Sequence, residues 1–410
     1  MSEREDSGLR RVLVLNSGSS GLKWSVLDVA LAEAQGAPAE PLAQGSLDWQ
    51  SAGAERQAEQ VRGVLQDNPA ARAVDAVGHR VVHGGARFRG PVRITAEVRR
   101  ALGELVEIDP LHTPAALAGI DAVAGEAPDL PQVAAFDTSF HTTLAPAAAL
   151  YPLPWEWTER FGLRRYGFHG LSVSYATRRL AELTGGTPRR LLVCHLGSGC
   201  SLTAVAEGRS ADTSMGFTPL DGVMMGTRSG AVDPGLLLHL QRRCGLSLEA
   251  LEDGLQHHSG LAGVSGAGGD LRKVLAAATG GSRRASLAFD LFVHSLVRMA
   301  GAMVAVLGGL DHLVLTGGIG EHSAVLRAAF LSRLEFLGVR LDQAANEAAP
   351  PTGGAGAAAG DREISSPASA VRVFVIAARE DLAVLRDLLT VLAPPAGVSP
   401  ASRRGPVPGT

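Results

Sequence analysis

The chain has 410 residues, of which 46% are hydrophobic, and a net charge of −3. This length fits two domains of roughly 100–200 residues each. The small net charge argues weakly against nucleic acid as the main partner, while the charged start and the short apolar runs predict neither a signal peptide nor a membrane span. The three cysteines have no metal-type spacing and indicate a reduced, cytoplasmic protein.

The first half of the chain mixes predicted strands and helices. Strands are expected at 12–15, 23–27, 74–82 and 132–136, and helices at 55–65, 95–106 and 113–124. Thr95 is expected to cap one helix, and Pro114 lies in the first turn of another. Residues 1–9 are expected to form a disordered arm, and residues 30–41 a loop.

The second half has a similar mixture. Strands are expected at 191–196, 202–206, 210–213, 312–315 and 371–376, and helices at 234–243, 248–255, 284–307, 323–334 and 380–392. Residues 344–370 have little pattern and are interpreted as a variable hairpin, and residues 394–410 as a disordered tail. The two halves together indicate a duplicated α/β unit with a cleft between its copies.

Two loops rich in Gly and Ser each follow an apolar strand. Residues 16–21 read Asn-Ser-Gly-Ser-Ser-Gly after the first strand, and residues 197–201 read Gly-Ser-Gly-Cys-Ser after the strand at 191–196. Glycines let backbone N–H groups turn toward an anion, and hydroxyls supply further donors. The sequence therefore predicts a protein that holds phosphates from two sides.

The segment Gly78–Gly85 reads Gly-His-Arg-Val-Val-His-Gly-Gly and carries the densest group of candidate residues. Alternate side chains of a strand share one face, so Arg80 and Val82 point the same way. A cation beside an apolar surface suits a small carboxylate with an alkyl end, and Arg can neutralise a phosphoryl group in transfer. The alternative is an ordinary strand with a surface Arg.

Further candidates are scattered along the chain. His112, His141 and His169 stand in separate segments, and none has the spacing of a zinc site. Asp137 ends a strand, where a carboxylate can hold Mg²⁺ directly or through water, although a turn-initiating Asp is common. Gly-rich loops surround Arg228, precede Asp270 and follow the strand at 312–315, while the Walker and protein-kinase motifs are absent.

Taken together, residues 16–20, residues 78–85 and the later segments resemble the acetate/propionate kinase family over about residues 12–392. The resemblance implies a duplicated actin-like ATPase fold of the acetate and sugar kinase type, with two domains around a nucleotide cleft and a homodimeric assembly. It places the N-terminal domain at 10–156 plus 381–393 and the C-terminal domain at 157–380. The implied reaction is reversible, direct in-line transfer of the ATP γ-phosphoryl to acetate, giving acetyl phosphate and ADP, with Mg²⁺ or possible Mn²⁺.

The resemblance also implies roles for individual residues. Those implied in catalysis are Arg80, Asp137, His169 and Arg228. Those implied in binding the carboxylate are Arg80, Val82, Leu111, His112, Phe168 and Pro219. Those implied in binding the nucleotide are Lys23, His195, Leu196, Gly197, Ser198, Gly199, Asp270, Leu271, Arg272, Gly318, Ile319, Gly320 and His322. Asn16 and Glu380 are implied in holding the metal ion, which Asp137 helps to organise.

Six positions depart from the family pattern. They are Gly21, Thr113, Val173, Ser198, His322 and Arg379, where the family usually has Ser, Asn, His, Asn, Asn and Asn. Each phosphate donor lost at 21 or 198 costs about 0.5–1.5 kcal/mol, which predicts weaker nucleotide affinity or slower turnover. A propionate kinase and a weakened nucleotide-binding relative remain open, while a phosphatase is disfavoured because no residue is placed to activate water in preference to the carboxylate.

Overall fold

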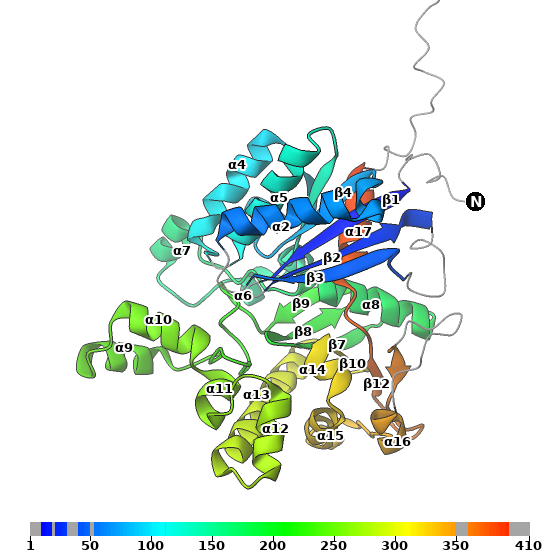
Figure 1. The fold of residues 1–410 in the computed structure, drawn as a ribbon. Coiled ribbons are helices and arrows are strands. Elements are labelled where there is room, and N and C mark those ends of the chain that lie inside the picture. The colour runs from blue at the N-terminus through cyan, green and yellow to red at the C-terminus, as the bar shows by residue number, and fades with distance from the viewer. Residues whose placement is uncertain are drawn as a thin grey trace, which may run out of the picture.

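The computed structural model contains two mixed β-sheets (Figure 1). It describes residues 10–18, 21–30, 40–49, 53–110, 112–348 and 360–392. The expected N-terminal arm and C-terminal tail lie outside the described residues. Most of the expected loop at 30–41 and the site candidate Leu111 lie outside them too.

The first sheet has six strands in the order β3-β2-β1-β4-β6-β5. Their bounds are β1 (Arg11–Ser17), β2 (Gly21–Asp28), β3 (Ala43–Asp48), β4 (Ala76–Val81), β5 (Val92–Arg93) and β6 (Gln132–Phe136). The β1–β2 and β2–β3 pairs are antiparallel, while β1–β4 and β4–β6 are parallel. Central β1 is an apolar run because both faces of the sheet are covered.

The second sheet repeats this arrangement in the order β9-β8-β7-β10-β12-β11. Its strands are β7 (Arg190–Leu196), β8 (Cys200–Ala206), β9 (Arg209–Thr213), β10 (His312–Thr316), β11 (Arg362–Glu363) and β12 (Arg372–Val375). The β7–β8 and β8–β9 pairs are antiparallel, and β7–β10 and β10–β12 are parallel. The predicted duplication of an α/β unit is therefore confirmed.

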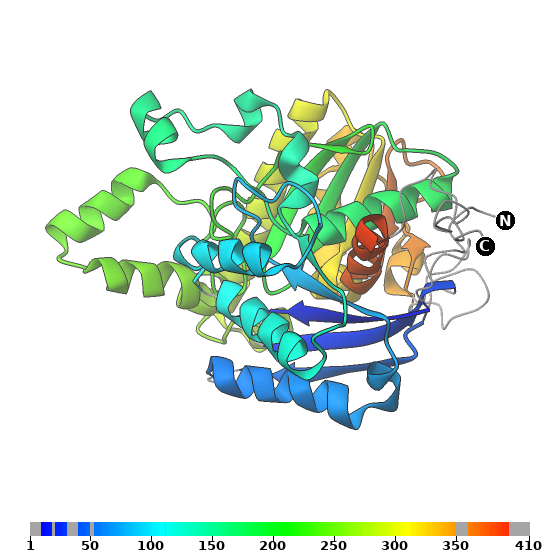
Figure 2. The same ribbon diagram turned by 90° about the horizontal axis from the view of Figure 1, so that it is seen from above.

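Two helices lie between the sheets (Figure 2) and join them into one molecule. Helix α17 (Glu380–Leu392) contacts β1, β4 and β6 as well as α8 (Gly170–Thr184), and α8 contacts β7 and β10. Their apolar side chains share one core with both sheets, which includes Val14, Leu180, Val314 and Leu388. The sequence predicted α17 with the observed bounds and missed α8, whose apolar residues lie on several sides rather than in one stripe.

Four helices pack around the other face of the first sheet. They are α2 (Ala54–Asp67), α3 (Pro69–Arg72), α4 (Ala96–Glu104) and α5 (Thr113–Glu126). The Thr95 hydroxyl accepts a hydrogen bond from the Val98 N–H at 3.2 Å, so the predicted N-cap is confirmed. A 3₁₀ helix at Leu105–Glu107 connects α4 to the segment before α5.

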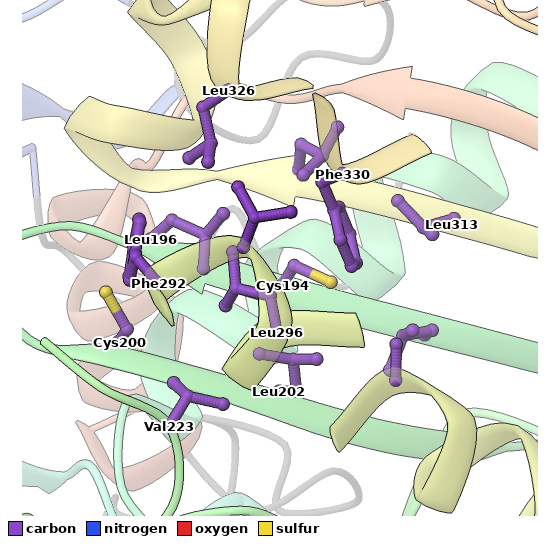
Figure 3. Close-up of a cluster of buried hydrophobic side chains, with 14 of the residues drawn as sticks. Cys194, Leu196, Cys200, Leu202, Val223, Phe292, Leu296, Leu313, Leu326 and Phe330 are labelled. Carbon is purple, nitrogen blue, oxygen red and sulfur yellow. The ribbon is translucent and has the colours of Figure 1, made fainter. Parts of the chain in front are cut away.

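The other face of the second sheet is covered by α11 (Gly260–Ser265), α12 (Leu271–Thr279), α13 (Arg283–Leu307) and α15 (Ala324–Ser332). Figure 3 shows Phe292 and Leu296 of α13 in one buried cluster with Cys194 and Leu202 of the second sheet. Within the described residues, α13 alone is long and apolar enough to cross a membrane by length and composition. Its inward side chains are buried in this core, as in the central helix of a globular protein.

The remaining helices are short or peripheral. They are α6 (Pro146–Ala149), α7 (Trp155–Phe161), α9 (Pro234–Arg243), α10 (Leu248–His257), α14 (Gly317–His322) and α16 (Gln343–Glu347), with 3₁₀ helices at Ser139–Thr143 and Glu335–Leu337. The variable hairpin expected at 344–370 is wrong in part. Its described residues include most of α16 and also β11, which pairs antiparallel with β12.

Candidate active site

The strand register brings polar side chains from both loops to one cleft. Asn16, the sixth residue of β1, lies opposite Lys23 of β2 and Arg80 of β4. His195, the sixth residue of β7, lies likewise opposite Ser201 of β8 and Thr316 of β10. Residues directly opposite one another on paired strands share a face. The duplicated sheets thus present equivalent polar rows.

A cleft of about 1070 Å³ lies where these rows meet. Its lining includes residues from the first sheet, from the second sheet and from the start of α17. The predicted site residues that line it are Asn16, Lys23, Arg80, His112, His169, His195, Gly197, Ser198, Gly199, Arg228, Gly318 and Glu380. The two predicted phosphate loops therefore face the same space.

Arg80 is the centre of a hydrogen-bonded group on the first-sheet side. Its guanidinium contacts the Asp137 carboxylate through Nη2 at 2.6 Å and through Nε at 3.1 Å. Its Nη1 donates to the Asn16 Oδ1 at 2.9 Å, and Asn16 Nδ2 donates to the Glu380 Oε2 at 2.7 Å. Four residues that are far apart in sequence are thereby held in one charged group, with 13% of the Arg80 side chain exposed.

The two carboxylates of this group have different electrostatic environments. Burial raises the pKa of Asp137, and the adjacent positive charge of Arg80 opposes that rise. Burial would also raise the pKa of Glu380, but Arg80, His195, the Asn16 amide and Lys23 together hold it below its usual value. Glu380 is therefore an anion at neutral pH.

His169 lies on the second-sheet side in a constrained backbone conformation. It is one of two non-glycine residues with positive φ among the described residues, at 59°, where the chain enters α8. Its Nδ1 is 2.9 Å from the Ser201 hydroxyl, and its ring stacks on His195 with centroids 4.2 Å apart. His195 is fixed in turn by the Ser172 hydroxyl, 2.8 Å from its Nδ1.

The charge environment keeps His169 neutral. Burial and the neighbouring His195, Arg80 and Arg228 lower the pKa of His169 well below its usual value. When Ser201 donates to Nδ1, the single ring proton lies on Nε2. His169 can then donate a hydrogen bond into the cleft without adding a positive charge.

Arg228 approaches His169 across Gly199. A Cβ at Gly199 would lie 3.4 Å from the His169 Nε2 and 3.5 Å from the Arg228 Nη1. Arg228 Nη1 also contacts the Pro219 carbonyl at 3.4 Å, which places Pro219 beside it. A small group bound next to Gly199 would therefore lie near a neutral hydrogen-bond donor, His169 Nε2, and near a cation, Arg228.

Comparisons with known proteins identify the architecture. A sequence model of the acetokinase family matches residues 11–386. The chain belongs to the acetokinase family. It is similar to the acetate kinase of Nostoc punctiforme, with 42% identity over 93% of this chain and 99% of the relative. It is also similar to the acetate kinase of a Synechococcus strain, with 50% identity over 77% of this chain and 76% of the relative.

Solved structures agree with this assignment to the acetokinase family. The acetate kinase of Porphyromonas gingivalis has a TM-score of 0.80 and 35% identity, and covers 93% of this chain and 100% of its own. A propionate kinase from Francisella tularensis has a TM-score of 0.82 and 33% identity, and covers 92% of this chain and 99% of its own. The predicted family and the predicted duplicated fold of the acetate kinases are confirmed.

The described residues of the predicted apolar pocket of this acetokinase-family chain are not among those that line the cleft. Val82 and Phe168 are buried in one cluster with Met215 and Val223, and Pro219 follows in the loop that contacts Arg228. Leu111 lies outside the described residues, so its predicted contact stays a prediction. Asp137 does not line the cleft itself and reaches it through Arg80.

The first segment predicted to contact adenosine, residues 270–272, is only partly exposed. Asp270 caps α12 and pairs with Arg272, whose side chain is 90% exposed, whereas Leu271 is buried in the core. The Gly226 N–H donates to the Ser198 carbonyl at 3.2 Å and Gly226 packs against Gly269, which places this segment beside the second phosphate loop.

The other segment predicted to contact adenosine belongs to α14, where the sequence suggested a loop. Gly318 is exposed and Ile319 half-buried, while Gly320 is buried and His322 is exposed at the C-terminal end of the helix. Leu196, which precedes the second loop, is fully buried, so only its backbone could face a ligand.

Three departures from the acetokinase pattern have structural explanations. A Cβ at Gly21 would collide with the Leu47 carbonyl of β3, so glycine suits this strand pair. Val173 is fully buried between the sheets, where an apolar side chain packs without an unpaired polar atom. Arg379 forms two 2.9 Å hydrogen bonds with Asp381, one residue beyond Glu380.

Sequence reasoning missed residues whose role depends on strand register. Ser201 and Ser172 fix the two histidine rings, and Gln44, Ser46 and Asp48 line the cleft from β3, a strand that was not predicted. The signal for Ser201 is its place in the second loop, opposite His195. The sequence did not predict β3, because this strand holds few apolar residues. In the structure its residues alternate between half-buried and exposed positions.

The oxygen donors of the site fit a magnesium ion. Among the described residues no group of three or more His, Cys, Asp and Glu side chains is arranged to hold a metal. Mg²⁺, however, commonly takes one or two carboxylates together with substrate phosphates and waters. Glu380 and the Asn16 amide supply such hard oxygen donors at the cleft, while Asp137 joins the same hydrogen-bonded group through Arg80.

Proposed function

We propose that this acetokinase-family chain transfers the γ-phosphoryl group of ATP reversibly to acetate, giving acetyl phosphate and ADP. Arg80 with its acidic partners and Arg228 with His169 lie around one cleft, and this arrangement supports the proposal. The acetate and propionate kinases among its relatives carry out reactions of this class, as their names state.

The chemistry needs positioning more than activation. A carboxylate is already a nucleophile at neutral pH, so no strong general base is required. We infer that Arg80 and Arg228 bind the acetate carboxylate and neutralise the equatorial oxygens of the phosphoryl group. Neutral His169 donates from Nε2 to the same group, and the transfer is direct and in line.

Residues of both loops hold the nucleotide in this proposal. We infer that backbone N–H groups of Ser198 and Gly199 and the Lys23 ammonium, which line the cleft, bind the phosphates from its two sides. The adenosine would lie against α14, whose Gly318 lines the cleft, and against residues 270–272 beyond the lining. Asn16 and Glu380, organised by Asp137, would hold Mg²⁺, which supplies charge neutralisation on the phosphates when bound; Mn²⁺ could replace it.

We infer the acid preference from the apolar residues predicted to contact the alkyl end of the substrate. Val82 and Phe168 are buried in one apolar cluster, and the Pro219 carbonyl contacts Arg228, so a pocket formed by these residues would suit a methyl or ethyl group. Propionate is the second candidate substrate, since a propionate kinase has a closely similar structure.

The test is an assay of purified protein with ATP, Mg²⁺ and a carboxylate, in which hydroxylamine traps the acyl phosphate. Acetate, propionate and butyrate are run in parallel with ADP release measured independently. We expect product with acetate, less with propionate and little with butyrate. ATP cleavage without trapped product would contradict transfer to a carboxylate and favour a hydrolase.

We also propose a domain division at 10–156 plus 381–393 and 157–380. It is supported by the first sheet, whose strands lie between residues 11 and 136, and by the second sheet, whose strands lie between 190 and 375. Helix α17 returns to contact β1, β4 and β6. Limited proteolysis near residue 156 with and without nucleotide would test this boundary.

We further propose a homodimer with a cytoplasmic location. Helices α9 and α10 project from the molecule (Figures 1 and 2), and Leu236, Leu238 and Leu248 on them are exposed. On the adjacent α13, Leu287 and Leu291 are also exposed. The free thiols Cys194, Cys200 and Cys244 fit a reducing compartment. Light scattering should give twice the chain mass, and Leu248→Asp should lower it.

A further inference from the structure

Asp109 is a buried carboxylate that the proposed chemistry does not use. It is 5% exposed and lies between the 3₁₀ helix at Leu105–Glu107 and α5. Its backbone is fixed at both ends, since the Asp109 N–H donates to the Leu105 carbonyl at 2.9 Å and the Thr113 N–H donates to the Asp109 carbonyl at 3.2 Å. A buried carboxylate is costly unless its oxygens are paired.

Both carboxylate oxygens of Asp109 have partners on the segment that begins α5. Oδ1 lies 2.8 Å from the Nδ1 of His112, and Oδ2 accepts from the Thr113 hydroxyl at 3.3 Å. An ionised carboxylate can only accept hydrogen bonds, so beside an ionised Asp109 the Nδ1 of His112 is the donor of this contact. Nε2 is then the only ring nitrogen that can change its protonation state.

His112 lines the same cleft as Arg80 and Arg228. A neutral ring with its proton on Nδ1 would present a lone pair on Nε2 to an incoming anion, which is unfavourable. A ring protonated on both nitrogens would donate to Asp109 from one side and to the anion from the other. Charge-assisted bonds of this kind are about twice as strong as neutral ones.

We propose that Asp109 is a positioning residue that fixes the orientation and tautomer of His112, so that Nε2 takes up a proton when an anion enters the cleft and donates to it. The proton comes from solvent and returns to solvent when the anion leaves. The proposal deepens the proposed function and rests on it for the identity of the anion, a small carboxylate.

Several charged groups surround this pair and affect its protonation. Arg80 and Arg228 on neighbouring elements disfavour an imidazolium, and the carboxylates Asp109 and Asp137 favour it. His83 also faces this pair, and burial lowers its pKa to about 4. Asp109 alone among the acids contacts the ring directly, so its removal should have a specific effect on anion binding.

The test compares full-length Asp109→Asn with the unaltered chain. Calorimetric titration of acetate in buffers of different ionisation enthalpy at pH 7.5 should show proton uptake in the unaltered chain and none in the variant. The KM for acetate should rise about tenfold or more, as expected for a lost charged hydrogen bond, while kcat changes much less. An unchanged KM with unchanged proton uptake would overturn the proposal.

Two further variants separate this role from a structural one. Asp121→Asn, on the exposed face of α5 and paired with Arg99, is the matched control and should behave like the unaltered chain. In a His112→Gln background, Asp109→Asn should add no further rise in KM, and an additive rise would contradict action through His112.

A spectroscopic readout is independent of turnover. Nitrogen NMR of the unaltered chain should show the His112 proton on Nδ1 without acetate and on both nitrogens with it. A neutral ring with its proton on Nε2 would overturn the proposal even if the enzyme makes acetyl phosphate. Absence of acyl phosphate with every carboxylate would refute the proposed function while this spectrum still decides the role of Asp109.

Discussion

Gly199 lies next to two of the groups that flank the proposed phosphoryl position, His169 and Arg228. A methyl group there would stand 3.4 Å from His169 Nε2 and 3.5 Å from Arg228 Nη1, in the space that we propose for the transferred group. We therefore expect Gly199→Ala to fold normally and to lower kcat about 10²-fold, as a misplacement of about 1 Å does in an active site.

The matched control for this change is Gly186→Ala. A Cβ at Gly186 would have no neighbouring atom within 4 Å, and the φ of this glycine is not positive. Steady-state turnover and thermal unfolding of both variants would be measured together. Full activity in Gly199→Ala would show that the phosphoryl group is not held above this glycine.

Residue types and short motifs were enough to predict Arg80 and Asp137 as candidates, because each lies in or at the end of a predicted strand, whereas the role of Asn16 came from the resemblance to the acetate/propionate kinase family. Their hydrogen-bonded group with Glu380 was not derivable from spacing, because 364 residues separate Asn16 from Glu380. No functional role was predicted for Asp109, because a single acid before a helix is common in any sequence.

Asp387 lies on α17, the helix that joins the two sheets. Partial burial raises the pKa of Asp387 to about 6, against the opposing charges of Arg178 and Arg386. The folded chain therefore binds more protons than the unfolded chain between about pH 4 and 6, and this group lowers stability as pH rises through that range.

Asp387→Asn should remove this effect. We expect it to raise the free energy of unfolding at pH 7.5 by at most about 3 kcal/mol, with the gain disappearing near pH 4. The exposed Asp129→Asn serves as control. Chemical unfolding at both pH values decides the point, and equal stability of Asp387→Asn and the unaltered chain at pH 7.5 would contradict it.

Elements with one apolar stripe or a clear cap were predictable, such as α2, α4 and α17. Helix α8 was missed because it is buried from two sides, and α14 was read as a loop because glycines dominate it. Tertiary packing overrides local propensity in both helices. Strand β3 was missed because one strand at a sheet edge needs few apolar residues.

Across the whole molecule, buried neutral histidines are a source of acid sensitivity. Burial lowers the pKa of His79, His83, His141 and His195 to about 4. Because the unfolded chain binds more protons than the folded one between pH 6.5 and 4, stability should fall as pH falls through that range. Each group should cost roughly 1 kcal/mol between pH 7.5 and 5.5.

Unfolding free energy measured by denaturant at pH 7.5, 6.5 and 5.5 tests this expectation. The loss should be steepest below pH 6.5 and should exceed the loss from any one histidine. A flat profile down to pH 5 would mean that these rings accept protons in the folded state, and would contradict their burial.

The duplication itself was visible in the sequence as two similar loops after two similar strands. The structure adds why the loops act together, since the parallel and antiparallel pairings of both sheets repeat and bring both loops to one cleft. Sequence spacing could not give the register that sets Lys23, Asn16 and Arg80 in one row and Ser201, His195 and Thr316 in the other.

We propose that cations from both halves of the molecule, Arg80 and Arg228, act on one phosphoryl group in transfer to acetate. The most direct test measures acetyl phosphate formation by the unaltered chain and by Arg228→Ala, with nucleotide affinity determined for both. We predict product from the unaltered chain and a loss of about 10³-fold or more in kcat for the variant, with nearly unchanged nucleotide binding. Similar turnover by both proteins would show that Arg228 does not act on the transferred phosphoryl group.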